Sequence, residues 1–370
     1  MTDIPAPAHI RAIAPYQAGK PIEELAREYG LDPEGIIKLA SNENPLGCSD
    51  RVRAALAEAA GALHGRYPDA NGFDLKAVLA ARHGVQANWI TLGNGSNDLL
   101  ELASLALLDE GTSAVYAQHA FVVYRLSTQA RGARHLMVPA RDYGHDLDAM
   151  LAAIADDTRL VFIANPNNPT GTHLSGPRVR AFLESVRARH GDRVAVLLDE
   201  AYDEYLDPEE RADSTQWVRE FPNLIVTRTF SKAYGLAGLR VGYALAQPAL
   251  TDLLNRVRQP FNVNVLAQVA ARVALDDTDF LARTYALNRA GRVQLQDGFA
   301  ALGLDFVPSH TNFVLVRVGD AARVNGELLR RGVIVRPVAG DGLPEHLRVS
   351  IGLPEENARL LEALKAVLQG

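Results

Sequence analysis

This 370-residue sequence has a single cysteine, no long apolar run and no excess of basic residues. Cys48 is the only cysteine, so an intrachain disulfide is impossible and a cage of thiolate ligands around a metal is excluded. No apolar run approaches the ~18 residues that a membrane-spanning helix needs. The net charge of −6 argues against a nucleic-acid-binding surface as the main function. We therefore expect neither a membrane nor a nucleic acid as a partner.

The first twenty residues contain Asp3 and three prolines and lack the apolar stretch of a secretory signal, so we expect a cytoplasmic protein. Hydrophobic residues make up 48% of the chain and charged residues 22%, which excludes a disordered, collagen-like or coiled-coil chain. At roughly 150 residues per domain, the length predicts two domains or one large domain with an appendage.

The middle of the sequence alternates short apolar runs with amphipathic stretches, which is typical of a mostly parallel sheet with crossover helices. Strands are predicted at 160–164, 194–198, 224–227 and 241–246. A helix is predicted over 177–190, between the first two strands, because apolar residues recur there at helical spacing. Its buried face consists of Val179, Phe182, Leu183 and Val186. A second helix is predicted after Ser96, with Ser96 or Asn97 as its N-cap.

After about residue 260 the pattern changes to a long helical segment, three strands and a closing helix. These strands are predicted at 310–318, 333–338 and 347–351, and the helix at 354–368. The sequence therefore predicts an α/β fold, a mostly parallel sheet with helices on both faces, plus a smaller α+β domain. We expect an N-terminal arm over 1–40 that packs with the small domain, a large domain over 41–260 and a small domain over 261–370.

Lysine is scarce as well, since only five of the 38 basic residues are lysines. Lys232 differs from the other four because it follows an apolar strand and precedes a run of small apolar residues. A lysine in such surroundings is desolvated, its pKa falls, and its neutral amine can form a Schiff base. The alternative is a lysine that extends its charged end to solvent at a strand end. Lys232 by itself does not decide between a Schiff-base lysine and a surface lysine.

Polar residues also follow the two strands before Lys232. Asp199 ends one apolar run and has Tyr202 three residues on, while Asn168 lies in an Asn-Pro-rich segment after the preceding run. A lone aspartate is often a helix cap, and Asn-Pro segments are often plain turns. In open parallel sheets, however, ligands bind at the carboxyl ends of the strands. Three polar positions on three successive strands therefore predict one shared ligand site.

These motifs resemble the fold type I pyridoxal-phosphate aminotransferases. The resemblance rests on Asn168-Pro169-Thr170-Gly171, Asp199 with Tyr202, and Ser231-Lys232 with Arg240. Within that group, further stretches look most like the histidinol-phosphate aminotransferases. They are Asn42-Glu43-Asn44-Pro45, Arg66-Tyr67-Pro68-Asp69, Ala237-Gly238-Leu239-Arg240, Gly332 to Arg336 and Leu347 to Gly352. The resemblance covers the chain nearly end to end, and it implies pyridoxal 5'-phosphate as the cofactor.

The resemblance also implies roles for residues around the cofactor ring. Lys232 would hold the cofactor covalently and carry a proton between substrate and cofactor. Asp199 would keep the pyridine nitrogen protonated, and Asn168 and Tyr202 would donate hydrogen bonds to the ring oxygen. Phe121 would stack on the ring where the family usually has a tyrosine, and it lacks the tyrosine's hydroxyl. We further predict a cis peptide bond between Asn168 and Pro169, which would aim Asn168 at the ring.

The cofactor's phosphate needs anion ligands, which a helix start can supply through its backbone N–H groups. The expected phosphate ligands are Ser96, Asn97, Thr229, Ser231 and Arg240. The resemblance implies that Tyr67 reaches the phosphate from the other subunit, so that the protein is a homodimer with shared sites. The alternative for Tyr67 is a half-buried turn tyrosine.

Substrate binding is expected from Arg336, Arg348, Tyr16 and Asn44. Arg348 matches the arginine that binds a carboxylate in most enzymes of this group. Arg336 could add a second guanidinium, so that the pair binds a phosphate dianion. Both arginines could instead lie on the surface. The ten histidines show no metal-ligand spacing, so we expect no metal site.

The leading hypothesis is transamination between histidinol phosphate and 2-oxoglutarate, which gives imidazole acetol phosphate and glutamate in histidine biosynthesis. An aromatic amino-acid aminotransferase of the same subgroup is the alternative, because that activity uses nearly the same motifs. A threonine-phosphate decarboxylase, in which the same cofactor breaks the carboxylate bond, is a third reading. The two aminotransferase hypotheses imply small-molecule amino donors and 2-oxo acids as partners, whereas the decarboxylase hypothesis does not.

Overall fold

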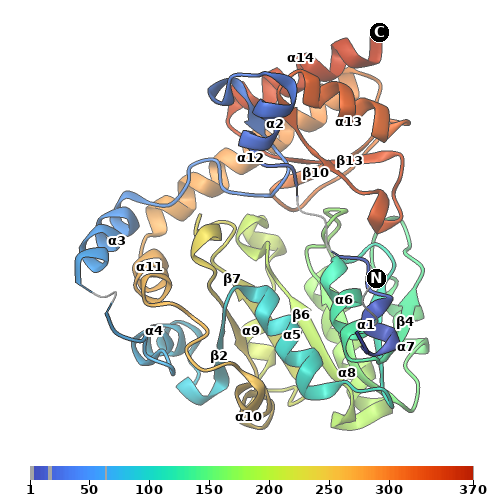
Figure 1. Ribbon diagram of the computed structural model, residues 1–370. Helices are drawn as coiled ribbons and strands as arrows, with labels where there is room; N and C mark the ends of the chain where they lie inside the picture. Colours follow the sequence, from blue (N-terminus) through green and yellow to red (C-terminus); the bar gives the residue numbers. More distant parts are fainter. Residues whose placement is uncertain (1–3, 16–18, 63–64, 370) are drawn as a thin grey trace.

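The computed structural model describes residues 4–15, 19–62 and 65–369. A large part is built around a seven-stranded sheet, and a smaller part lies above it (Figure 1). The long helix α12 (Thr278–Ala301) runs from one part to the other (Figure 1). None of the described helices is long and apolar enough to cross a membrane.

The large sheet has the strand order β2-β8-β7-β6-β5-β3-β4. Only β8 runs antiparallel to its neighbours, so the sheet is mostly parallel as predicted. The strands are β2 (Ile90–Gly93), β3 (Ser113–Ala117), β4 (Arg134–Val138), β5 (Thr158–Ala164), β6 (Ala195–Asp199), β7 (Leu224–Thr229) and β8 (Gly242–Leu245). The four predicted strands correspond to β5 through β8 with ends shifted by one or two residues, and β2, β3 and β4 were not predicted.

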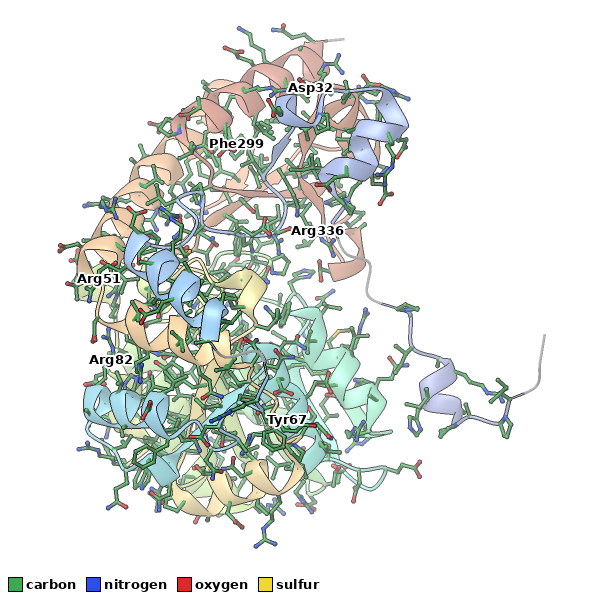
Figure 2. All side chains as sticks on the ribbon, turned by 60° about the vertical axis from the view of Figure 1, so that its left-hand side comes forward. Asp32, Arg51, Tyr67, Arg82, Phe299 and Arg336 are labelled. Atoms are coloured by element: carbon green, nitrogen blue, oxygen red, sulfur yellow. The ribbon has the colours of Figure 1, made fainter. Side chains whose placement is uncertain are left out.

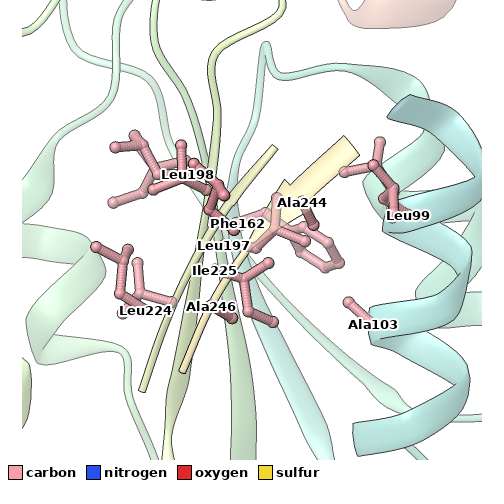
Figure 3. Packing of buried hydrophobic residues seen from close by; sticks show 14 of the residues in the cluster. Leu99, Ala103, Phe162, Leu197, Leu198, Leu224, Ile225, Ala244 and Ala246 are labelled. Carbon is pink, nitrogen blue, oxygen red and sulfur yellow. The ribbon is translucent and has the colours of Figure 1, made fainter. Parts of the chain in front are cut away.

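Helices cover both faces of this sheet because both faces are apolar. Leu99 and Ala103 of α5 face Phe162 and the neighbouring strands, whereas Leu198 points to the opposite side of the sheet (Figure 3). The helices of the large part are α3 (Asp50–Ala62), α4 (Phe73–His83), α5 (Ser96–Leu107), α6 (Val122–Ala130), α7 (Leu147–Ala152), α8 (Gly176–His190), α9 (Ser214–Trp217), α10 (Pro248–Val257) and α11 (Val265–Leu275).

Two helix predictions can be compared directly with α8 and α5. Helix α8 buries all four residues of the predicted face, so that prediction is confirmed. Helix α5 also forms, but its N-cap is Gly95 and not Ser96 or Asn97. Gly95 has a φ of +82°, a backbone conformation that suits glycine, and the chain turns into the helix there.

The small part is an antiparallel sheet of order β12-β13-β10-β9, packed with helices around its own core. Its elements are β9 (Phe306–Val307), β10 (Phe313–Arg317), α13 (Ala321–Arg330), β11 (Val333–Ile334), β12 (Arg336–Pro337), β13 (His346–Ser350) and α14 (Pro354–Gln369). The single strand predicted over 333–338 is wrong. It is split at Val335, because β11 pairs with β1 whereas β12 pairs with β13.

The first forty residues contact both parts of the molecule. Strand β1 (Ile37–Lys38) pairs in parallel with β11, and α2 (Ile22–Tyr29) packs its Leu25 near Ile334. Helix α1 (Ala8–Arg11) lies instead beside α6 of the large part (Figure 1).

The predicted helical segment after residue 260 is two helices, with α12 starting anew where Asp277 accepts a hydrogen bond from the Phe280 N–H. The buried alanines of α11 belong to the core of the large part. We propose that the domain boundary lies within α12, and the predicted boundary at 260 stays a prediction.

Candidate active site

A cavity of about 520 Å³ opens at the carboxyl ends of β5, β6 and β7, below the small part. It brings together most of the residues that the sequence predicted for the cofactor and substrate sites. Those that line it are Ser96, Asn97, Phe121, Asn168, Asp199, Tyr202, Thr229, Ser231, Lys232, Arg240, Arg336 and Arg348.

Lys232 lies three residues beyond β7 and projects into this cavity. Burial, and after it the positive charge of Arg348, lower the pKa of Lys232 to about 8. Its Nζ lies 3.3 Å from the carbonyl oxygen of Ser41 and 5.8 Å from the centre of the Tyr202 ring. The amine therefore deprotonates far more readily than an exposed lysine.

Asp199 is the last residue of β6 and is buried at the cavity wall. Its carboxylate accepts hydrogen bonds from the Tyr124 hydroxyl at 2.8 Å and the Thr227 hydroxyl at 3.2 Å. Burial raises the pKa of Asp199, and these two hydrogen bonds oppose that rise. Sequence reasoning missed Tyr124, because it lies on the buried face of α6 and looks like an ordinary core residue.

An anion-binding cup forms where α5 begins. Ser96 and Asn97 occupy the first turn of α5, whose backbone N–H groups have no partner within the helix. The guanidinium of Arg240 lies against Gly95 and donates to the Ser231 hydroxyl at 3.3 Å. A side-chain carbon on Gly95 would come within 2.3 Å of that guanidinium, so glycine is required for the close approach.

The other residues predicted to contact the cofactor ring line the cavity from three different segments of the chain. The Asn168–Pro169 peptide bond is cis, as predicted, and Asn168 Oδ1 accepts a hydrogen bond from Arg348 at 2.7 Å. The Tyr202 hydroxyl accepts a hydrogen bond from the Asn42 side chain at 3.0 Å. Phe121 caps α6 and lines the cavity with its ring edge-on to Tyr124.

Two arginines of the small part close the cavity. Arg336 and Arg348 are paired neighbours on β12 and β13, and both line the 520 Å³ cavity. Both also line an adjoining cavity of about 450 Å³, together with Lys20 and Arg125. The structure therefore concentrates positive charge on the side of the cavity that lies away from Asp199.

Two of the predicted residues lie elsewhere. Asn44 does not line the cavity, because its side chain donates to the Ala233 carbonyl at 2.8 Å and to the Thr284 hydroxyl at 3.0 Å. Its neighbour Asn42 lines the cavity instead, so the structure does not bring Asn44 to the predicted substrate site. Tyr67 is 82% exposed on the large part, away from Arg336 (Figure 2). Tyr16 lies outside the described residues.

The donor set fits one kind of group. A lysine amine with a lowered pKa faces a buried carboxylate, and a helix-start cup for an anion lies beside them. Pyridoxal phosphate carries an aldehyde for the amine, a ring nitrogen for the carboxylate and a phosphate for the cup. Fold and site together define a pyridoxal-phosphate-dependent enzyme.

Comparisons with known proteins give the particular family. The model of the family "Aminotransferase class I and II" matches residues 34–364. The chain is 62% identical to histidinol-phosphate aminotransferase 1 of Cupriavidus pinatubonensis, covering 98% of this chain and 96% of the relative. It is 63% identical to histidinol-phosphate aminotransferase 2 of Ralstonia nicotianae, with the same coverage.

A solved structure agrees with these relatives. Histidinol-phosphate aminotransferase from Sinorhizobium meliloti, in complex with pyridoxal-5'-phosphate, superposes with a TM-score of 0.89 at 29% identity over 100% of this chain and 98% of that one. The chain belongs to the class I and II aminotransferases, and within them to the histidinol-phosphate aminotransferase family. It is a pyridoxal-phosphate-dependent transaminase, as the sequence motifs predicted.

Proposed function

We propose that the enzyme transfers an amino group from histidinol phosphate to 2-oxoglutarate, giving imidazole acetol phosphate and glutamate in histidine biosynthesis. Relatives that carry this name are 62% and 63% identical over nearly the whole chain. We expect it to act in the cytoplasm, which stays a prediction.

The observation that carries the choice of substrate is the pairing of Arg336 with Arg348 across β12 and β13. Arg348 is held by two hydrogen bonds of 2.7 Å, to Asn168 Oδ1 and to the Ala40 carbonyl, which fixes its guanidinium at the cavity. Two adjacent guanidiniums bind a phosphate dianion better than they bind a single carboxylate. An aromatic amino acid brings only a single carboxylate, so this arrangement favours histidinol phosphate.

We assign the cofactor's contacts as follows. The first turn of α5 would hold the phosphate together with Ser231, Thr229 and Arg240, and Asp199 would hold a proton at the ring nitrogen. The hydrogen bonds from Tyr124 and Thr227 favour the ionised form of Asp199 and oppose the rise in its pKa that burial causes. When bound, pyridoxal phosphate supplies an electron sink for the carbon that loses its proton.

Lys232 has two tasks in this assignment. Its amine would hold the cofactor covalently, and it would accept and return a proton at the substrate carbon. A pKa of about 8 matches both tasks near neutral pH, because the neutral and protonated amines are then both populated. Tyr202 and Asn168 would donate hydrogen bonds to the ring oxygen, and Phe121 would stack on the ring.

We also propose a homodimer in which Tyr67 completes the neighbouring subunit's phosphate cup. Tyr67 is 82% exposed and does not line the cavity of its own chain. Its ring stacks on Phe261, which is itself 43% exposed, with centroids 4.7 Å apart. An exposed aromatic pair of this kind suits a protein interface.

The experiment that tests the substrate is replacement of Arg336. Arg336→Ala should lose about 2 kcal/mol in kcat/KM for histidinol phosphate, since a buried charge-assisted contact contributes about 1.5 to 3. Phenylalanine, if used at all, should lose much less, because Arg348 still holds a carboxylate. The measurement is kcat/KM for both amino donors, with replacement of the exposed Arg331, directly after α13, by alanine (Arg331→Ala) as the control variant.

Two results would contradict the proposal. Equal losses for both donors would remove the phosphate-specific role of Arg336. A wild-type enzyme that strongly prefers phenylalanine or tyrosine would point to an aromatic amino-acid aminotransferase.

A further inference from the structure

Three potential metal ligands meet outside the cofactor cavity, where the large and small parts touch. His173, Glu210 and His310 each bring one ligand atom, and these atoms all lie within 4.8 Å of one another. His173 follows the Asn168 loop, Glu210 ends the short 3₁₀ helix η5 (Pro208–Glu210), and His310 lies between β9 and β10. None of the three has a role in the transamination assigned above.

A close backbone contact fixes the two histidines relative to each other. The N–H of His310 donates to the Gly171 carbonyl at 2.9 Å. Gly171 has a φ of +80°, and a side-chain carbon there would come within 2.6 Å of the Ser309 hydroxyl. Only glycine allows the loop to lie this close, so the rings of His173 and His310 end with centroids 5.2 Å apart.

We propose that His173, Glu210 and His310 bind one Zn²⁺ ion. Two imidazoles and one carboxylate are a ligand set that zinc accepts, with a fourth position left for water. Tetrahedral ligands at about 2.0–2.1 Å from zinc stand roughly 3.4 Å apart. The His310 Nδ1 to Glu210 Oε2 distance is 2.9 Å, and all three ligand atoms lie within 4.8 Å of one another, which is close to this spacing.

Access and charge favour a cation at this place. The side chains of His310 and Glu210 are 31% and 34% exposed, so an ion can enter from solvent. Within the described part of the chain, the ring nitrogens of His173 make no hydrogen bond, and they are available to a metal. Asp203 adds negative charge that acts on His173, although it also pairs with Arg228.

The ion would join the two parts of the enzyme. His173 and Glu210 belong to the large part and His310 to the small part, so zinc would tie the loop that carries Asn168 to the start of β10. We therefore expect zinc to stabilise the fold more than it changes the chemistry at Lys232.

The test is calorimetric titration of the chelator-treated holoenzyme with Zn²⁺. We expect one ion per chain in wild type, and a loss in affinity for His310→Ala and His173→Ala that exceeds the roughly 10- to 100-fold cost of losing an outer-shell contact. Zn²⁺ should raise the thermal midpoint of wild type but not of these variants. Glu210→Gln keeps the shape and removes the charge, so it serves where an alanine variant fails to fold.

The matched control is His9→Ala. His9 also lies beside a glutamate, at 3.8 Å from Glu110, but it has no second histidine within reach among the described residues. Its loss should leave zinc binding unchanged. The proposal falls if wild type binds no zinc, or if the His310, His173 and Glu210 variants bind it as well as His9→Ala does.

Discussion

The chemistry of single residues in the cavity depends on the proton of Lys232. Burial and Arg348 together bring its pKa to about 8 from the ordinary 10.5. At pH 7 about a tenth of the amine is then neutral, against roughly one part in 3,000 for an exposed lysine. The first step of cofactor attachment uses only the neutral amine.

We expect the rate of cofactor attachment to the apoenzyme to rise with pH through a midpoint of about 8. The lowered pKa means that the amine loses its proton over this range, and the rate levels off above it. Absorbance after mixing with pyridoxal phosphate measures the rate. Arg348→Gln should move the midpoint upward, because the second cause of the lowered pKa is gone. A midpoint near 10.5 in wild type would contradict the role of burial.

Residue types at strand ends could be predicted from the sequence, but side-chain directions could not. Lys232 and Asp199 were identified because the strands before them are apolar and sheets bind ligands at that edge. Asn42 and Asn44 lie in one turn, and only the structure shows that Asn42 faces the cavity whereas Asn44 holds the Ala233 carbonyl. Tyr124 was missed for the same reason, because the sequence does not show that its hydroxyl points to Asp199.

At the scale of elements, the start of α5 determines how the phosphate is held. We expect Gly95→Ala to weaken pyridoxal phosphate binding at least about tenfold, or 1.4 kcal/mol, because the methyl group would displace the Arg240 guanidinium and the φ of +82° would be strained. Fluorescence titration of the apoenzyme measures the affinity. Gly61→Ala in α3, where a side-chain carbon meets nothing within 4 Å, is the control. Equal affinities in the two variants would show that the cup tolerates the change.

The elements predicted in the large part have clear apolar patterns, but the short buried strands β2 and β3 were missed as well. Helix α8 shows four apolar residues at helical spacing, and β5 to β8 are nearly continuous apolar runs. Strand β4 is an edge strand with exposed Arg134, His135 and Met137, so it has no such run. The split between β11 and β12 follows from pairing with distant strands, which no local pattern reports. The three proposed metal ligands are equally remote from one another in sequence, at 173, 210 and 310.

At the scale of the whole molecule, shared sites can be tested by mixing subunits. Lys232→Ala and Tyr67→Ala should each be nearly inactive alone. Random exchange makes about half the dimers mixed, and one of the two sites in each mixed dimer is intact, so about a quarter of wild-type activity should return. Activity after verified subunit exchange is the measurement. Exchange without recovery would show that the partner's Tyr67 does not complete the site.

The parallel pairing of β1 with β11 has a consequence for how the chain folds during its synthesis on the ribosome. Ile37 finds its partner Val333 almost 300 residues later in the chain, and at about 5 to 20 residues per second a ribosome needs roughly 15 to 60 s to deliver it. During that time the large sheet can already form, since its last strand ends at Leu245. The segment that leads into Asn42 therefore waits for nearly the whole chain. A nascent chain can acquire the pocket floor around Asp199 long before its roof, and only release of the C-terminal strands completes the enclosure.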